Sequence, residues 1–429
     1  MTRTTHWFLL LCIVGLALLP RSALLPNSIA YVLTALPLLA VGYLLLRQRK
    51  LEITVHRPTA ILLMSIYAVF VFHALSGGLF GTPSLNELVR AITFTLVTSV
   101  YLFFVPKIFA VEDFIWMVAR VSAVVALIGI PTAVVGTYSL FGITVTPHVY
   151  DLNLPLFVID PATIDPITSI MDNPNSMGFV VSLGFACGLA EIERDWRDWV
   201  AWGVLGINFL GAYLTGSRAA AGALGITVSV YLSYKVLGRW MTGLYVGTLL
   251  ASLVYVLAVA LGFLPGPEPI ATLNLRDREL IWLGIWRAIE TSPLFGVGLG
   301  NHMAFIAPYA PPDGVAATHN SYARMLLTTG FVGAVAYVLL TLSAIRLSFR
   351  ATGPAKISLI AGTTIIAFHQ IWVGFSIFGL ATQSVLSAIL FGYVITGSDA
   401  EFAPPSRSES GGESRAGADL DTADTAPQD

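Results

Sequence analysis

Apolar runs of about twenty residues recur along the whole chain, and they limit what it can fold into. A run of that length can cross a bilayer as a helix, whereas the strands of a membrane barrel alternate over roughly ten residues. The composition agrees, because 56% of the residues are hydrophobic and only 11% are charged. An average soluble domain carries about 25% charged residues. We therefore predict an all-α integral membrane protein.

Twelve apolar segments are predicted to be transmembrane helices. They fall near residues 7–20, 28–46, 59–80, 88–110, 114–136, 174–190, 199–215, 217–236, 240–263, 321–345, 357–378 and 380–396. Basic residues cluster between the second and third segments, the sixth and seventh, the eighth and ninth, and the tenth and eleventh. Because basic loops favour the cytoplasmic side, this pattern predicts that both termini lie inside.

The opposite, external side then carries two long loops, 137–173 and 264–319, the second between the ninth and tenth helices. Loops of this length are uncommon unless they are functional or flexible. We predict a membrane domain over residues 1–396 and an acidic cytoplasmic tail over residues 397–429. That tail contains eight acidic residues and two arginines and almost no large apolar residue, so disorder is expected.

Polar motifs cluster where the external loops meet the membrane. The first is DNPNSMG, from Asp172 to Gly178, at the start of the sixth segment. Asn-Pro and Pro-Asn favour turns and helix starts, so Asn175 or Ser176 is expected to cap the helix. For Asn175 alone, capping is the slightly favoured interpretation.

The second motif is LTGSRAAAG, from Leu214 to Gly222, between the seventh and eighth segments. Thr215 and Gly216 predict a tight turn, and Ser217 can cap the next helix. Arg218 then lies in the first turn of that helix, where the helix dipole disfavours a cation. An anionic ligand would offset this cost, since a helix N-terminus and a guanidinium both bind phosphate. The alternative is an arginine that extends toward the interface.

A third region, 275–301, lies in the larger external loop. An amphipathic helix at the membrane surface is predicted there, because apolar residues recur at helical spacing: Trp282, Ile285, Trp286 and Ile289. The glycines 296, 298 and 300 follow as a flexible turn. They form no dinucleotide fingerprint, because no strand precedes them. A tight turn beside a packed helix is their favoured interpretation.

Two arginines, Arg276 and Arg278, stand at the start of the predicted surface helix and flank Asp277. Arg278 suits two roles equally well: ligand binding, or a surface salt bridge with Asp277 or Glu279. Both roles remain open from the residues alone.

His319 and Asn320 end the same loop, directly before the tenth segment. As a pair they read as a helix cap, with Asn320 the better capping residue. His319 also suits a general base, because its pKa fits proton transfer near neutral pH. His148 and His302 are the other histidines of the external loops. No metal-binding spacing accompanies these residues, so no metal site is expected, and no G-x-S-x-G elbow of a serine hydrolase is present.

Taken together, these motifs resemble the O-antigen ligase superfamily over about residues 170 to 335. In chain order the motifs are Pro174-Asn175, T-G-S-R at Thr215 to Arg218, R-x-x-x-W at Arg278 to Trp282, P-x-x-G-x-G at Pro293 to Gly298, H-N-x-Y at His319 to Tyr322 and G-x-x-G at Gly330 to Gly333. Each motif is short, and their order and spacing carry the resemblance.

The resemblance implies a GT-C-like helical fold and a metal-independent, inverting glycosyltransferase without a cofactor. The donor would be a glycan on a polyprenyl (pyro)phosphate carrier, and the acceptor a hydroxyl of a glycan, lipid or protein outside the cell membrane. By motif position, His319 would be the general base, and Arg218 and Arg278 would hold the donor (pyro)phosphate. Residues expected to support them are Asn175, Ser217, Arg276, Asn320 and Tyr322. Membrane lipids are the other expected contact, and no nucleic-acid partner is expected.

The motifs leave open the choice between ligase, Wzy-type polymerase and O-linked oligosaccharyltransferase, between a dolichyl and an undecaprenyl carrier, and the oligomeric state. The alternative from another class is a multipass transporter or flippase of lipid-linked glycans. Such a protein would place charges near the membrane midplane, whereas Arg90, Arg120 and Arg324 lie near segment ends. A structural scaffold would leave the external arginines and histidine unexplained.

Overall fold

The computed structural model describes residues 3–48, 52–77, 84–140, 142–148, 166–271, 278–300, 302–310 and 317–396. Within these ranges the protein is all-α apart from one small hairpin, in which β1 (Tyr138–Leu140) pairs antiparallel with β2 (Ile143–Val145). The hairpin falls in the first predicted external loop. Arg276 and the predicted acidic tail lie outside the described residues.

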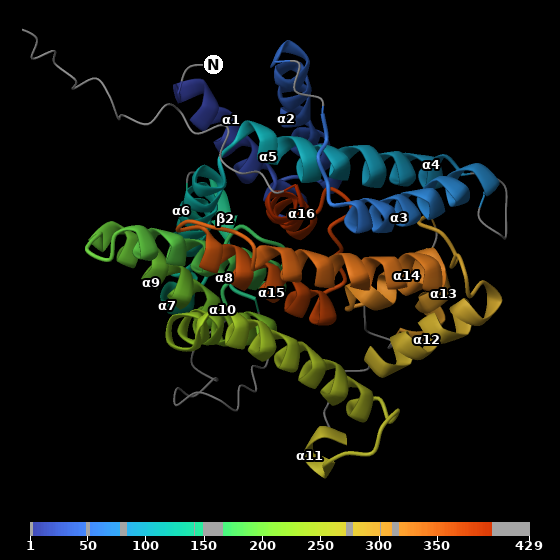
Figure 1. Ribbon diagram of the computed structural model, residues 1–429. Helices are drawn as coiled ribbons and strands as arrows, with labels where there is room; N and C mark the ends of the chain where they lie inside the picture. Colours follow the sequence, from blue (N-terminus) through green and yellow to red (C-terminus); the bar gives the residue numbers. More distant parts are fainter. Residues whose placement is uncertain are drawn as a thin grey trace, which may run out of the picture.

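The amino-terminal half contains a series of helices (Figure 1). They are α1 (Arg3–Leu16), α2 (Asn27–Gln48), α3 (Arg57–Ser76), α4 (Leu85–Ile92), α5 (Val105–Ile108), α6 (Val111–Gly129) and α7 (Thr132–Val135), with the short helix η1 (Leu19–Arg21) after α1. Two π-helical segments, Thr93–Val97 and Val100–Phe104, connect α4 to α5, so residues 85–108 form one helical stretch.

The carboxy-terminal half contains the remaining helices. They are α8 (Pro174–Arg194), α9 (Trp199–Leu214), α10 (Arg218–Ala260), α11 (Glu268–Ala271), α12 (Arg278–Thr291), α13 (His302–Ile306), η5 (Ala307–Tyr309), α14 (Ser321–Ser348), α15 (Lys356–Trp372) and α16 (Thr382–Ile395). Gly238 interrupts α10 with φ 77°, at the predicted boundary between the eighth and ninth segments.

Eight helical stretches of the described chain are long and apolar enough to cross a membrane. They are Arg3–Arg21, Asn27–Gln48, Arg57–Ser76, Leu85–Ile108, Val111–Val135, Pro174–Arg194, Arg218–Ala260 and Ser321–Ser348. Two shorter apolar helices, α9 and α16, accompany them. Every predicted segment thus contains helix, although the eleventh, 357–378, is helical only to Trp372, and the prediction that the chain is a membrane protein holds. The number of twelve spans and the GT-C-like arrangement stay predictions.

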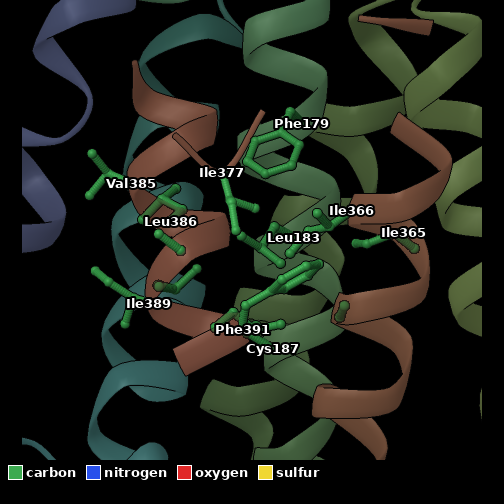
Figure 2. Packing of buried hydrophobic residues seen from close by; sticks show 14 of the residues in the cluster. Phe179, Leu183, Cys187, Ile365, Ile366, Ile377, Val385, Leu386, Ile389 and Phe391 are labelled. Carbon is green, nitrogen blue, oxygen red and sulfur yellow. The ribbon is translucent and has the colours of Figure 1, made fainter. Parts of the chain in front are cut away.

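The centre of the molecule is formed by α8, α15 and α16, whose side chains are almost entirely buried. Figure 2 shows apolar side chains of these helices meeting, among them Leu183 of α8, Ile366 of α15 and Phe391 of α16. Ile377, in the segment between α15 and α16, reaches into the same cluster. This packing fixes the position of the segment after α15, which the candidate site uses.

Basic residues that were predicted to share one side of the membrane do meet at one end of the bundle. Lys235, just before the break in α10, bonds Glu193 at the end of α8 at 2.6 Å. Lys356, at the start of α15, lies 5.0 Å from the ring of Tyr234. The starts of α8 and α10 and the end of α15 therefore lie toward the opposite end of these helices. Which end faces the cytoplasm remains a prediction.

Candidate functional site

His319 and Asn320 stand at the start of α14. Asn320 is its N-cap, and its side-chain oxygen accepts a hydrogen bond of 2.9 Å from the amide of Ala323. The predicted cap is confirmed. His319 has φ 45°, a left-handed backbone conformation that is uncommon outside glycine. Its side chain is half-buried, and its ring makes no hydrogen bond to any other residue that the structure describes. Part of this side chain is therefore accessible from outside the protein.

Two other segments hold the backbone around His319. The indole Nε1 of Trp282 in α12 donates a hydrogen bond of 2.9 Å to the carbonyl oxygen of Thr318. After α15, Gly374 lies so close that a Cβ there would be 2.7 Å from Thr318 Oγ1 and 3.2 Å from the His319 nitrogen. The hydroxyl of Ser321 donates to the carbonyl of Val373 at 2.8 Å. An unusual backbone conformation persists when its surroundings fix it in this manner.

Arg278 is the first residue of α12 and lies one helical turn before Trp282. Residues four apart share one face of a helix, so the R-x-x-x-W motif directs both side chains to the same side. Burial lowers the pKa of the His319 imidazole, and the nearby charge of Arg278 lowers this pKa further. His319 is therefore neutral at pH 7, and an imidazole nitrogen can accept a proton.

The α12 helix packs on the start of α14 through Ile281, Ile285 and Ile289, which are buried with Leu327. The predicted amphipathic helix is confirmed, although its buried face differs by one position. Trp286, expected on the apolar face, is 52% exposed. Its contact with a membrane surface stays a prediction.

The glycine-rich loop after α12 is bonded into a break in α14. Gly330 interrupts α14 with φ 62° and ψ −165°, which leaves neighbouring backbone groups without helical partners. The amide of Val297 donates to Leu327 O at 2.8 Å, and the amide of Phe331 donates to Pro293 O at 2.8 Å. A Cβ on Gly330 would lie 2.4 Å from the carbonyl carbon of Leu294. The P-x-x-G-x-G motif and the first glycine of G-x-x-G thus form one structural unit.

The same loop is held from its other side by α3 and α4. The carboxylate of Glu87 accepts hydrogen bonds from the amides of Leu299, at 2.5 Å, and Gly300. His73 Nε2 lies 2.6 Å from Phe295 O, and Arg90 Nη1 donates to Leu299 O at 2.6 Å. The expectation of a flexible turn was therefore wrong, and the favoured alternative of a tight, packed turn is correct.

Arg218 lies in a second group of site residues, at the starts of α8 and α10. Ser217 is the N-cap of α10, as predicted, and its hydroxyl donates to Asn175 Oδ1 at 2.9 Å. Arg218 follows as the first residue of α10 and has an exposed side chain. The predicted cap of α8 was wrong, because Asn173 caps that helix through the amide of Ser176 at 2.9 Å. Pro174 occupies the first helical position, which leaves Asn175 at the second, two residues after the cap.

The residues around His319 and those around Arg218 are connected through the segment that follows α15. Gly374 packs against His319, and the next residue, Phe375, packs on Phe179 of α8 with ring centroids 5.0 Å apart. Phe179 lies one turn after Asn175. Arg278 thus interacts electrostatically with His319, whereas Arg218 lies in the neighbouring group.

Tyr322 and His302 both make packing or hydrogen-bond contacts within the protein. The Tyr322 hydroxyl donates to Ala367 O at 3.3 Å, and its ring packs near that of Tyr337. His302 is 2% exposed, and its Nδ1 lies 3.0 Å from Leu299 O. Burial lowers the pKa of His302 to about 3, and the charge of Arg324 contributes. Neither side chain resembles that of His319, which is half-buried directly before the start of α14.

Sequence reasoning missed Glu87, His73 and Gly374, because each acts on a segment far away in the chain.

A metal site is a separate question. Within the described ranges, no three His, Cys, Asp or Glu side chains come together in a way that could hold a metal ion. Arg278 is the cation that interacts with His319.

Residues 203–338 match the family model described as O-antigen ligase. The match confirms the resemblance to the O-antigen ligase superfamily. It contains Arg218, Arg278, His319 and the Gly330 break, and it begins after Asn175. No curated protein matches the chain. The match to this family model supports glycan transfer of the ligase or polymerase type, with lipid-linked donors and acceptors in general.

Proposed function

We propose that this protein transfers a glycan from a polyprenyl (pyro)phosphate carrier to an acceptor hydroxyl on the external face of the membrane. The reaction would invert the anomeric centre and use no metal. The observation that carries the proposal is the arrangement at the start of α14, where a neutral, half-buried His319 lies beside the cation Arg278. A base and an anion-binding group next to each other are what transfer from a phosphate-linked sugar requires.

His319 would act as the general base. As the acceptor oxygen attacks the sugar C1, it loses its proton to the imidazole, which is neutral because burial and Arg278 lower its pKa. The bond between C1 and the phosphate oxygen breaks on the opposite face of the sugar, which inverts C1. A positioned base typically contributes 10²–10⁴-fold to a rate.

Arg278 and Arg218 would stabilise the leaving (pyro)phosphate. A cation about 4 Å from a developing negative charge is worth about 4 kcal/mol at an effective dielectric near 20. Two arginines can therefore supply the charge stabilisation that other phosphosugar enzymes obtain from a divalent ion. Arg218 adds the start of α10, whose backbone amides favour anions.

The test is transfer by the purified protein in lipid nanodiscs, with a synthetic polyprenyl pyrophosphate glycan as donor and an oligosaccharide acceptor. The proposal predicts a product of inverted anomeric configuration by NMR and an unchanged rate in EDTA. If EDTA abolished transfer, only the metal-independent part of the proposal would be wrong. The alternative of a flippase predicts movement of the lipid-linked glycan across a vesicle membrane without a transfer product.

A further inference from the structure

Three arginines from separate parts of the chain gather near the start of α14. Arg21 ends η1, Arg90 lies in α4, and Arg324 lies in the first turn of α14. The charge of Arg324 interacts with those of both Arg90 and Arg21. Like charges repel one another, and all three arginines are half-buried, where charges are screened less than at the surface. A gathering of three cations therefore indicates a negative partner.

The partners within the described chain compensate these charges only in part. Arg324 Nη1 donates to Gly374 O at 3.0 Å, and Arg90 donates to Leu299 O, so both bond carbonyl groups and not carboxylates. Arg21 alone has a carboxylate, that of Asp172, at 3.0 Å. Glu87 lies one turn before Arg90 on α4 and offsets part of its charge, although its two oxygens bond the amides of the glycine-rich loop and not the guanidinium.

An independent observation points the same way. The Nε of Arg21 is buried and has no hydrogen-bond partner among the described residues, although its side chain is 42% exposed. His302 borders the same region and is uncharged at pH 7, with its pKa lowered to about 3 by burial and by Arg324 and Arg90. The neutral His302 therefore adds no charge to this region. An orphaned donor on a half-open guanidinium is where an anion would bind.

Each arginine is attached to a segment of the candidate site. Gly374, which bonds Arg324, packs against the backbone of His319. Leu299, which bonds Arg90, belongs to the glycine-rich loop. Asp172, which bonds Arg21, precedes the Asn173 cap of α8. The cluster therefore borders the same segments as His319, and it shares no residue with the pair Arg218 and Arg278.

We propose that Arg21, Arg90 and Arg324 form a second anion-binding subsite, which takes a phosphate group. Guanidinium forks match the geometry of phosphate oxygens. A pyrophosphate carrier has two phosphates, and this subsite would hold one while Arg218 and Arg278 hold the other. That use rests on the proposed function, whereas anion binding itself does not. An anionic lipid headgroup offers the same chemistry.

Binding is measured by titration calorimetry on the full-length protein in phosphatidylcholine nanodiscs, with farnesyl pyrophosphate as probe and farnesol as its uncharged control. Arg21→Gln and Arg324→Gln are each expected to weaken pyrophosphate binding about tenfold, about 1.4 kcal/mol. Arg287→Gln is the matched control, because Arg287 is an exposed arginine that pairs with Glu290 on α12. If Arg324→Gln does not purify as a folded protein, Arg21→Gln carries the test.

A second arm separates the two sources of phosphate. Phosphatidylglycerol nanodiscs are added as a competitor. If they compete less well with the cluster variants than with the parent protein, while the variants bind farnesyl pyrophosphate as tightly as before, the subsite binds a lipid headgroup. Unchanged affinity of Arg21→Gln for both probes would overturn the subsite. These readings do not involve glycan transfer, so a protein that bound pyrophosphate through the cluster but transferred nothing would refute only the proposed function.

Discussion

The indole Nε1 of Trp282 donates a hydrogen bond of 2.9 Å to the carbonyl oxygen of Thr318, one residue before His319. This bond connects α12 to the start of α14. Arg278 lies one turn before Trp282, so the same helix that carries the cation also fixes the backbone of the proposed base. The spacing in R-x-x-x-W therefore lets one helix carry the Arg278 cation and also hold the backbone beside His319.

Replacing Trp282 with Phe keeps an aromatic ring but removes the donor. A hydrogen bond of this kind contributes about 1 kcal/mol, so kcat/KM for glycan transfer is expected to fall about fivefold. The loss should appear in kcat more than in KM, because the base is misplaced and the donor site is kept. A Trp286→Phe variant, on the exposed side of α12, should transfer normally. Equal losses in both variants would show that the bond to Thr318 has no special role.

Gly330→Ala should destabilise the protein. The backbone at φ 62° and ψ −165° is strained for any other residue, at about 1–3 kcal/mol. The new Cβ would also lie 2.4 Å from the Leu294 carbonyl carbon. We expect a lower midpoint of thermal unfolding in detergent. Gly225→Ala is the control, because a Cβ at Gly225 in α10 meets nothing within 4 Å. A Gly330→Ala midpoint equal to that of the control would contradict the proposed unit of loop and break.

Asn320→Ala removes the cap of α14 and should lower the free energy of unfolding by about 1 kcal/mol. Asn320→Ser retains an oxygen that can accept from the Ala323 amide, so it should restore most of the loss. Thermal unfolding of both variants measures the effect. If serine and alanine behaved alike, the hydrogen bond to Ala323 would not contribute to stability.

The pH dependence of transfer should reflect His319. The base acts in its neutral form, so kcat/KM rises with pH through the His319 pKa and is constant above it. Burial and the charge of Arg278 both lower this pKa, and the plateau therefore extends to pH 7 and below. Arg278→Gln removes one of the two causes. The acid limb of the profile should then move to higher pH, in addition to any loss in amplitude.

A limb that stayed in place in Arg278→Gln would show that another group controls the profile. Lys at position 278 provides the control. A lysine keeps the charge but loses the planar fork, so Arg278→Lys should leave the limb near its original pH while weakening donor binding.

The helices could be predicted from sequence because apolar runs and charged loops are local signals. The caps Asn320 and Ser217 were predictable for the same reason, since a cap bonds an amide three residues away. Pro174 shows the limit of such reasoning, because its preference for the first helical position moved the cap to Asn173.

The contacts that hold His319 could not be predicted from one sequence. Gly374 packs against it from a segment 55 positions later, and Glu87 reaches the glycine-rich loop from α4. These contacts depend on how the helices pack, which no local pattern encodes. The motifs P-x-x-G-x-G and G-x-x-G were recognisable as patterns, but their mutual hydrogen bonds appear only in three dimensions.

His319→Ala is the direct test of His319 as the general base. Transfer from a polyprenyl pyrophosphate glycan is measured for this variant and for His56→Ala, which alters an exposed histidine before α3. We expect His319→Ala to lose roughly 10²–10⁴-fold in rate, while its membrane insertion and farnesyl pyrophosphate binding match the parent protein. His56→Ala should keep full activity. Transfer by His319→Ala within a few-fold of the parent protein would contradict the assignment of His319 as the base.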